Sequence, residues 1–479
     1  MTLDGSVRPE TAADPTPADP DEAAPDAPGG RSTWSALRPL VLRLHFYAGV
    51  LVAPLLLIAA TSGLLYALSF QAEKFVYAHE LTVPEGEGTV PLSQQVHAAK
   101  KVNPDGTVTA VWPSAEPGAT TRVLMADPDM EEGKSLAVFV DPYTGEVRGQ
   151  LASYGGSGAL PLRTWLDELH RDLHLGELGR NYSELAASWL WVVALGGLAL
   201  WIGRRRKAKR ELFLPERGPK SRRRTLSWHG AVGLWAVTGL VLLSATGLTW
   251  SRYAGENIDA VRSQLGGATP TVSAVIGAGD GDAAGQEGHA GHGGGAPAQA
   301  ATGPDVGIDK VLAAAREAGV DGKLTVTLPA EGKGYVVKET DTQFPVHLDS
   351  VAVNPADGTV MDELRFADHP LLAKLTRFGI DAHTGVFLGL ANQLALAALA
   401  LALILLIVWG YRMWWLRRPG RPVARGAWRK VPPTMLLPLL AGTALAGWFV
   451  PMLGISLLVF LAVDGLLGLA ARARARQDA

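Results

Sequence analysis

Several runs of about 20 apolar residues constrain this chain more than any other feature of its sequence. A helix of that length spans the ~30 Å hydrocarbon core of a bilayer. With 48% hydrophobic and 19% charged residues, the 479-residue chain is also apolar for a soluble protein of its size. We therefore expect an α-helical polytopic membrane protein with about six transmembrane helices.

The apolar runs and the polar stretches between them divide the chain into segments. The expected segments are a disordered tail (1–32), a first span (33–70), an outer α+β unit (71–183), a second span (184–203), a basic loop (204–227), a third span (228–250), a second outer α+β unit (251–380), a fourth span with its lead-in (381–416), a second basic loop (417–432), a hairpin of two spans (433–472) and a short tail (473–479). Within the first outer unit, 93–102 is expected to be an amphipathic helix, 123–125 and 136–140 strands, and 141–146 a tight turn.

The basic residues predict how the chain is oriented. Every basic cluster, including those after Trp201 and Trp414, falls on one side of the membrane if the N-terminus is cytoplasmic. Because positive charge is enriched in cytoplasmic loops, we expect both termini inside and both polar regions outside.

The two halves of the chain are related by an internal duplication. Adding 184 to a residue number pairs His45 with His229, and adding 213 pairs His170 with His383. The difference, 213 − 184 = 29, is about the length of the Gly/His-rich stretch 277–303, which we interpret as an insertion. Each repeat is a span, an outer unit and a span in the same orientation. Two parallel repeats related by a pseudo-twofold axis along the membrane normal are expected, with the final hairpin outside them.

The duplicated histidines are the candidate cofactor-binding residues. Two imidazoles that face one another from different helices, in an apolar slot, can ligate a haem iron. His45 and His229 fit this role near the cytoplasmic face, and His170 and His383 form a second symmetric pair on the outer side. His174, one helical turn after His170, is a further candidate ligand. The alternatives are that the first pair contacts water or lipid headgroups and that the second pair forms surface salt bridges.

The depth of the outer pair is open. A continuous helix from His170 to Trp201 would be about 46 Å long, more than the membrane thickness. Either His170 lies at or above the outer interface, or the chain bends at Gly176 and Gly179. Metal centres at opposite edges would be ~30 Å apart, so we expect deeper histidines or an intervening group such as a tryptophan, Trp189 or Trp235.

Other charged residues have competing interpretations. Arginines near the outer face could hold an anionic iron chelate or be ordinary solvated charges: Arg163, Arg171, Arg365 and Arg377. Glu184 could cap a helix end or relay protons. His289 and His292 could bind copper or zinc, although a flexible linker is the simpler interpretation.

The sequence excludes several classes of function. Without cysteine there are no disulfides, iron–sulfur clusters or thiolate metal sites. No credible nucleotide fingerprint, Ser/His/Asp constellation or HExxH motif occurs, so neither hydride transfer from a bound nicotinamide nor hydrolysis is expected. The basic loops are explained by membrane topology and require no nucleic acid. No catalytic residue is identified.

These features together resemble the PepSY-associated transmembrane helix family over about 35–418. The resemblance rests on the first span that begins at His45, the turn Asp141-Pro142-Tyr143-Thr144-Gly145-Glu146, and the histidines His170 and His383 before the next spans. It implies a bacterial cytoplasmic (inner) membrane protein associated with iron uptake, similar to ferric-siderophore reductases that carry b-type haems between their helices, with two haems expected here.

The function implied by the resemblance is that of a membrane oxidoreductase. Electrons from a cytoplasmic reductase or a quinol would cross the lipid bilayer through haem b and reduce a ferric siderophore or other iron chelate outside. The alternative is a non-catalytic PepSY membrane scaffold or binding protein for a peptide, a metal or a partner protein.

Overall fold

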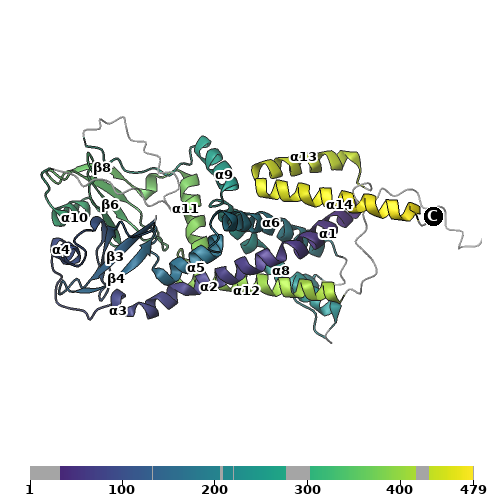
Figure 1. Cartoon of the computed structure of the whole chain (residues 1–479), viewed down its shortest axis with the longest axis horizontal. Helices are drawn as coiled ribbons and strands as arrows, with labels where there is room; N and C mark the ends of the chain where they lie inside the picture. Colours follow the sequence, from purple (N-terminus) through teal and green to yellow (C-terminus); the bar gives the residue numbers. More distant parts are fainter. Residues whose placement is uncertain are drawn as a thin grey trace, which may run out of the picture.

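A computed structural model of the chain describes residues 33–131, 133–204, 209–218, 221–276, 303–416 and 431–477. The expected disordered tail (1–32), parts of both basic loops, and the Gly/His-rich stretch 277–302 with His289 and His292 lie outside the described residues. In Figure 1 the outer α+β units form a β-sheet layer at one end of an elongated molecule, and the apolar helices extend from it. We call these the sheet end and, away from it, the distal end.

The first repeat begins with two helices that form an almost continuous rod, α1 (Thr33–Leu51) and α2 (Ala53–Val76). The interruption lies at Val52, directly before Pro54, which lacks a backbone N–H and is placed in the first turn of α2. The rod extends six residues beyond the expected end at 70. The remaining elements of this repeat are α3 (Ala78–Leu81), α4 (Leu92–Val102), β1 (Thr107–Trp112), β2 (Thr121–Ala126), β3 (Lys134–Val140), β4 (Val147–Tyr154), α5 (Pro161–Asp172) and α6 (Glu177–Ile202).

The second repeat follows the same order after a short helix, α7 (Arg210–Phe213). Its elements are α8 (Arg222–Leu248), α9 (Tyr253–Gln264), α10 (Ile308–Glu317), β5 (Leu324–Thr327), β6 (Tyr335–Glu339), β7 (Ser350–Val353), β8 (Val360–Leu364), the 3-10 turn η1 (Phe366–Asp368), α11 (Leu371–Thr384) and α12 (Leu390–Trp415). The hairpin of α13 (Pro433–Phe449) and α14 (Pro451–Gln477) ends the chain as expected. The prediction of two parallel repeats plus a hairpin is confirmed.

The two outer units share one antiparallel sheet of eight strands, in the order β4-β3-β2-β1-β5-β6-β7-β8. The equivalent strands β1 and β5 join the units, and Val111 is the partner of Val326. Two copies of one strand related by a twofold axis perpendicular to them must run antiparallel, so this pairing agrees with the expected pseudo-symmetry. Both valines are fully buried, in a core that α4 and α10 complete.

The sequence-based expectations for the first outer unit are confirmed in detail. Both strands and the amphipathic helix form, and the expected turn connects β3 to β4. Asp141 Oδ1 accepts a hydrogen bond from the Tyr143 backbone N–H at 2.8 Å, and Gly145 adopts φ 77°, a conformation that favours glycine. The second repeat has the same turn, with Gly358 at φ 81°.

Five described helices are long and apolar enough to cross a membrane: α2, α6, α8, α12 and the 451–471 part of α14. The sixth expected span, α13, has 17 residues and is shorter. In the bundle α6 packs on α8, while α12 packs on both α2 and α8. The hairpin joins this bundle through polar contacts: Arg43 of α1 pairs with Asp464 of α14, and Trp189 Nε1 of α6 donates to Ser456 Oγ at 2.9 Å.

Candidate functional site

The structure brings His45 and His229 together inside the helix bundle. Their ring centroids are 6.3 Å apart, and the ring planes make an angle of 74°. His45 comes from the α2-proximal half of α1 and His229 from the first third of α8. The duplication therefore predicted a real spatial pair.

Each of these two rings is held by a hydrogen bond to a backbone carbonyl of its own repeat. His45 Nδ1 donates to the Val193 carbonyl of α6 at 2.9 Å, and His229 Nδ1 donates to the Leu406 carbonyl of α12 at 3.0 Å. Val193 and Leu406 are themselves repeat mates, 213 residues apart. Because a carbonyl oxygen only accepts, the proton lies on Nδ1. The Nε2 lone pair of each neutral ring is therefore available to a metal ion.

His170 and His383 form a second arrangement with the same symmetry, nearer the sheet end. His170 of α5 lies against Ser62 of α2, with 2.9 Å between Nδ1 and Oγ. His383 of α11 lies against Thr246 of α8, with 2.7 Å between Nδ1 and Oγ1. Their partners Ser62 and Thr246 are themselves repeat mates, 184 residues apart.

The hydroxyl groups fix the tautomer of the second pair as the carbonyls fix that of the first. Ser62 Oγ donates its proton to the Ile58 carbonyl at 2.9 Å, and Thr246 Oγ1 donates to the Leu242 carbonyl at 2.7 Å. Each hydroxyl has only one proton, so each must accept from the imidazole Nδ1–H. The Nε2 atoms of His45, His229 and His383 thus make no hydrogen bond within the described part of the chain, whereas the His170 ring also interacts with the Ala59 carbonyl.

A chain reversal resolves where His170 lies. Helix α5 ends at Asp172, and Leu173 and His174 both adopt φ 55° before α6 begins at Glu177. A Cβ at Gly179 would overlap the Asp172 carbonyl, so glycine allows the close approach of the two helices. Of the two possibilities, the bend is therefore correct, and His170 folds back against Ser62 of α2.

The expectation that His174 lies one helical turn from His170 and faces the same way is wrong, because the helix has ended before it. His174 stacks near the Trp165 ring, at 5.0 Å between centroids, and its Nδ1 is 3.4 Å from Glu168 Oε2. Its side chain remains about one-third exposed at 32%. His174 is thus separate from the His170–His383 pair.

Glycines in repeat-related positions make room for the four rings. A Cβ at Gly63 would be 3.1 Å from His170 Cε1, and one at Gly247 would be 3.4 Å from His383 Cε1. Around the first pair, a Cβ at Gly197 would be 2.9 Å from His45 Cε1, and one at Gly410 would be 4.0 Å from His229 Cε1. The sequence was not read as predicting a role for Gly197 or Gly410, although the shift of 213 that pairs His170 with His383 also pairs these two glycines. The roles of Ser62 and Thr246, which the shift of 184 pairs, were not predicted either.

The spacing of the first pair is that of two imidazoles on one metal ion. An imidazole nitrogen lies ~1.1 Å from its ring centroid, and a metal–imidazole bond, as to zinc, is ~2.0–2.1 Å long. Two rings that ligate one ion from opposite sides therefore have centroids about 6.3 Å apart. The observed 6.3 Å between His45 and His229 matches this value. The spacing and the free Nε2 atoms of His45 and His229 are thus compatible with a bis-histidine haem, although an edge-to-face ring contact has the same centroid distance.

The two histidine pairs lie at different depths along the bundle. From His229 to Thr246, the partner of His383, helix α8 rises about 26 Å over 17 residues. Trp189 lies between these levels on α6, one turn from Val193, and is buried. Trp235 also lies between these depths on α8, but it faces away from the bundle interior, because its side chain is 70% exposed and Nε1 donates to the Phe213 carbonyl.

The charged residues near the sheet end have partners within the protein. Arg163 forms a buried ion pair with Glu73, at 3.1 Å between Nε and Oε2, and Arg377 pairs with Asp381. Arg171 pairs with Asp167 and Asp172, and Arg365 with Asp349 and Glu363. These arginines are therefore neither unpaired sites for a chelate nor simply solvated.

Glu184 is fully buried and caps a helix. Its carboxylate accepts from the backbone N–H groups of Tyr253 and Ala254, both at 3.0 Å, at the start of α9. An acidic side chain at a helix N-terminus satisfies free N–H groups and complements the helix dipole. This confirms the capping interpretation.

Five helices apolar enough to span a membrane, four of them in two repeats that share one sheet and position paired histidines, define a multi-pass membrane protein. A family model described as the PepSY-associated TM region matches residues 42–417, and the chain belongs to that family. No curated protein matches the chain.

Proposed function

We propose that this protein is a haem-dependent membrane oxidoreductase that carries electrons across the cytoplasmic membrane of a bacterium and reduces an external ferric chelate, such as a ferric siderophore. The observation that supports this most directly is the His45–His229 pair, with 6.3 Å between ring centroids and both Nε2 atoms free. The family resemblance supplies the expectation of b-type haem and of iron uptake.

The proposed ligands are His45 with His229 for one haem b and His170 with His383 for the other. Bound haem would supply reversible one-electron transfer at each level. The protein positions the ligands: the Val193 and Leu406 carbonyls fix the first two rings, and the hydroxyl groups of Ser62 and Thr246 fix the second two. Such outer partners set ring orientation and ligand basicity.

The direction of electron flow follows from the proposed topology. By the positive-inside rule the basic loops at the distal end face the cytoplasm, and the sheet faces outside. The His45–His229 level would then receive electrons from a cytoplasmic reductase or a quinol. The His170–His383 level, beneath the outer sheet, would deliver them toward the chelate. Trp189, buried on α6 between the two levels, is the candidate intermediate group.

Reduction by the full-length protein in sealed vesicles tests this function. The protein is reconstituted with haem, a membrane-impermeant reductant is enclosed on the side of the basic loops, and a ferric siderophore with a ferrous-iron indicator is added outside. We expect indicator colour with wild type and a loss of at least tenfold in rate with His229→Ala. His97→Ala, which changes an exposed residue of α4, is the matched control.

A haem-containing protein that gives no faster reduction than empty vesicles would contradict the reductase proposal. A protein that binds no haem but retains a peptide, metal or partner protein would instead support the alternative, a non-catalytic PepSY membrane scaffold. The two outcomes are therefore distinguishable in one preparation.

A further inference from the structure

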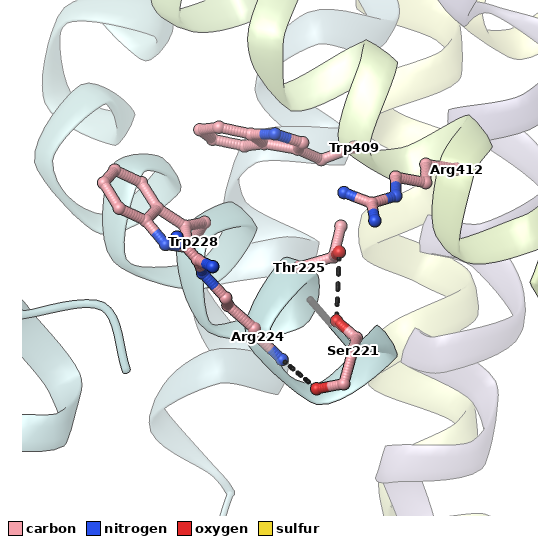
Figure 2. Close-up of a pocket in the computed structure, with 6 residues that line it drawn as sticks. All are labelled: Ser221, Arg224, Thr225, Trp228, Trp409 and Arg412. Atoms are coloured by element: carbon pink, nitrogen blue, oxygen red, sulfur yellow. Dashed lines mark hydrogen bonds between the residues drawn. The ribbon is translucent and has the colours of Figure 1, made fainter. Parts of the chain in front are cut away.

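A cavity at the distal end of the bundle has no part in holding the histidines. It lies between α8 and α12 and has a volume of about 250 Å³. Figure 2 shows its lining, in which side chains from the start of α8 face two side chains from the end of α12. The lining residues are Ser221, Arg224, Thr225, Trp228, Trp409 and Arg412.

Among the described residues, the lining is cationic and contains no carboxylate. Arg224 uses one N–H group, donating from Nη1 to the Gly218 carbonyl at 2.9 Å, and keeps other donors. Arg412 has no hydrogen bond or ion pair to any other side chain that the structure describes. The carboxylate of Glu216 is engaged by Arg223, at 2.9 Å between Nε and Oε2. Each arginine therefore keeps N–H donors that an anion in the cavity could use.

The backbone adds to the positive potential. Ser221 is the N-cap of α8, a helix of 27 residues, and its Oγ accepts from the Arg224 N–H at 3.3 Å. The N-terminal end of a helix carries a partial positive charge and free N–H groups. Arginine pairs and helix N-termini are recurrent partners of phosphate oxygens.

The surroundings of the cavity indicate a lipid rather than a soluble anion. Trp228 and Trp409 form an aromatic wall, with 5.9 Å between ring centroids. On α12 an exposed apolar stripe leads toward the cavity at helical spacing: Leu401, Leu405 and Val408, with exposed fractions of 50%, 37% and 51%. Arg412 continues that stripe by one turn. An acyl chain along the stripe would place its headgroup at the two arginines.

The feature is specific to the second repeat. The positions that correspond to Arg224 and Trp228 in the first repeat are Leu40 and Leu44. Those that correspond to Trp409 and Arg412 are Gly196 and Ala199. The cavity is thus not a consequence of the repeat architecture, which needs neither arginine.

We propose that this cavity binds the phosphate of an anionic phospholipid, whose acyl chain lies along the α12 stripe and whose headgroup contacts Arg224 and Arg412. The guanidinium groups recognise the phosphate, and the tryptophans pack against the glycerol region at the membrane interface. This site does not depend on the proposed reductase function.

Lipid retention by the full-length protein tests the proposal. Wild-type protein is equilibrated in vesicles of phosphatidylglycerol and phosphatidylcholine, transferred to detergent and analysed by native mass spectrometry. We expect retained phosphatidylglycerol with wild type and at least a tenfold loss with Arg224→Gln/Arg412→Gln, because the variant loses both charge-assisted hydrogen-bond donors to the phosphate. Arg222→Gln/Arg223→Gln removes the same charge beside the cavity and should retain the lipid.

Other outcomes would overturn the proposal. If wild-type protein retains phosphatidylcholine and phosphatidylglycerol equally, the site does not select an anionic headgroup. This result does not depend on the folding of any variant. Displacement of the lipid by millimolar inorganic phosphate would indicate a soluble-phosphate site. If the glutamine variant keeps its lipid but binds less haem, the two arginines contact a haem carboxylate and not a lipid phosphate. Arg224→Lys/Arg412→Lys, which preserves the charge, should keep more lipid than the glutamine variant.

Discussion

The imidazole rings of His45 and His229 lie 6.3 Å apart between centroids, although 184 positions separate them in the chain. Each ring donates from Nδ1 to the carbonyl of a residue that the duplication also pairs, Val193 or Leu406. A metal ion between the two Nε2 atoms would therefore be held by two equivalent half-sites.

This equivalence predicts equal effects of the two single substitutions. His45→Ala and His229→Ala should each lower the haem content by the same amount, to about half if two haems bind, and the double variant should lose no more. Haem per protein after haem-replete expression measures this, with His97→Ala as the control. Unequal losses would reject a shared ligand pair.

The second pair depends on hydroxyl acceptors that can be removed without changing the ligands. Ser62→Ala and Thr246→Val each delete the acceptor of one Nδ1–H, and loss of such a partner typically costs ~10–100-fold in affinity for the metal group. Haem titration and the midpoint potential of the second haem would show the effect. Thr61→Val is the matched control, because Thr61 Oγ1 bonds only the Leu57 carbonyl on an exposed face. A loss as large in Thr61→Val would argue against a specific role for Ser62.

Substitution of the two repeat-related glycines Gly197 and Gly410 should affect haem binding differently. Gly197→Ala would place Cβ 2.9 Å from His45 Cε1, so the ring must shift, whereas Gly410→Ala leaves 4.0 Å to His229 Cε1. We expect haem loss or a shifted spectrum only with Gly197→Ala. Gly442→Ala, where no atom lies within 4 Å of the added Cβ, is the control. A larger effect of Gly410→Ala would contradict the packing described here.

Because Glu184 caps α9, its substitution should lower the thermal stability of the protein without changing its haem content. Glu184→Ala would leave the Tyr253 and Ala254 N–H groups at the start of α9 without an acceptor, at a cost of ~1–3 kcal/mol. Glu177→Ala removes an exposed carboxylate that pairs with Arg252, and an exposed pair is worth ~0–1 kcal/mol. Thermal unfolding followed by tryptophan fluorescence should show a lower Tm mainly for Glu184→Ala. Equal Tm values for the two variants would refute the capping role.

Much of this architecture is predictable because the duplication carries three-dimensional information. The length of the apolar runs predicts the membrane-spanning helices, and the shifts of 184 and 213 identify both histidine pairs. The same shifts pair Ser62 with Thr246 and Gly197 with Gly410, so the duplication also marks these residues as symmetry-related positions near the histidines. Their roles became evident only from the ring contacts.

Other features could not follow from the sequence because they depend on long-range geometry. The reversal after α5 uses left-handed backbone at Leu173, His174 and Gly176; the glycines made a bend one of two possibilities, but Leu173 and His174 do not show where the helix ends. Helical periodicity continued past Asp172 therefore predicts, wrongly, that His174 lies on the same face as His170. Likewise, the pairing of Val111 with Val326 joins strands from different repeats, and no local pattern specifies that contact.

The visible spectrum of the purified full-length protein tests the central claim most directly. After haem-replete expression, we predict a Soret band with the sharp reduced bands of six-coordinate, low-spin haem, which His45→Ala and His229→Ala diminish equally. Wild-type protein that is folded and monodisperse but has no Soret band would contradict the account.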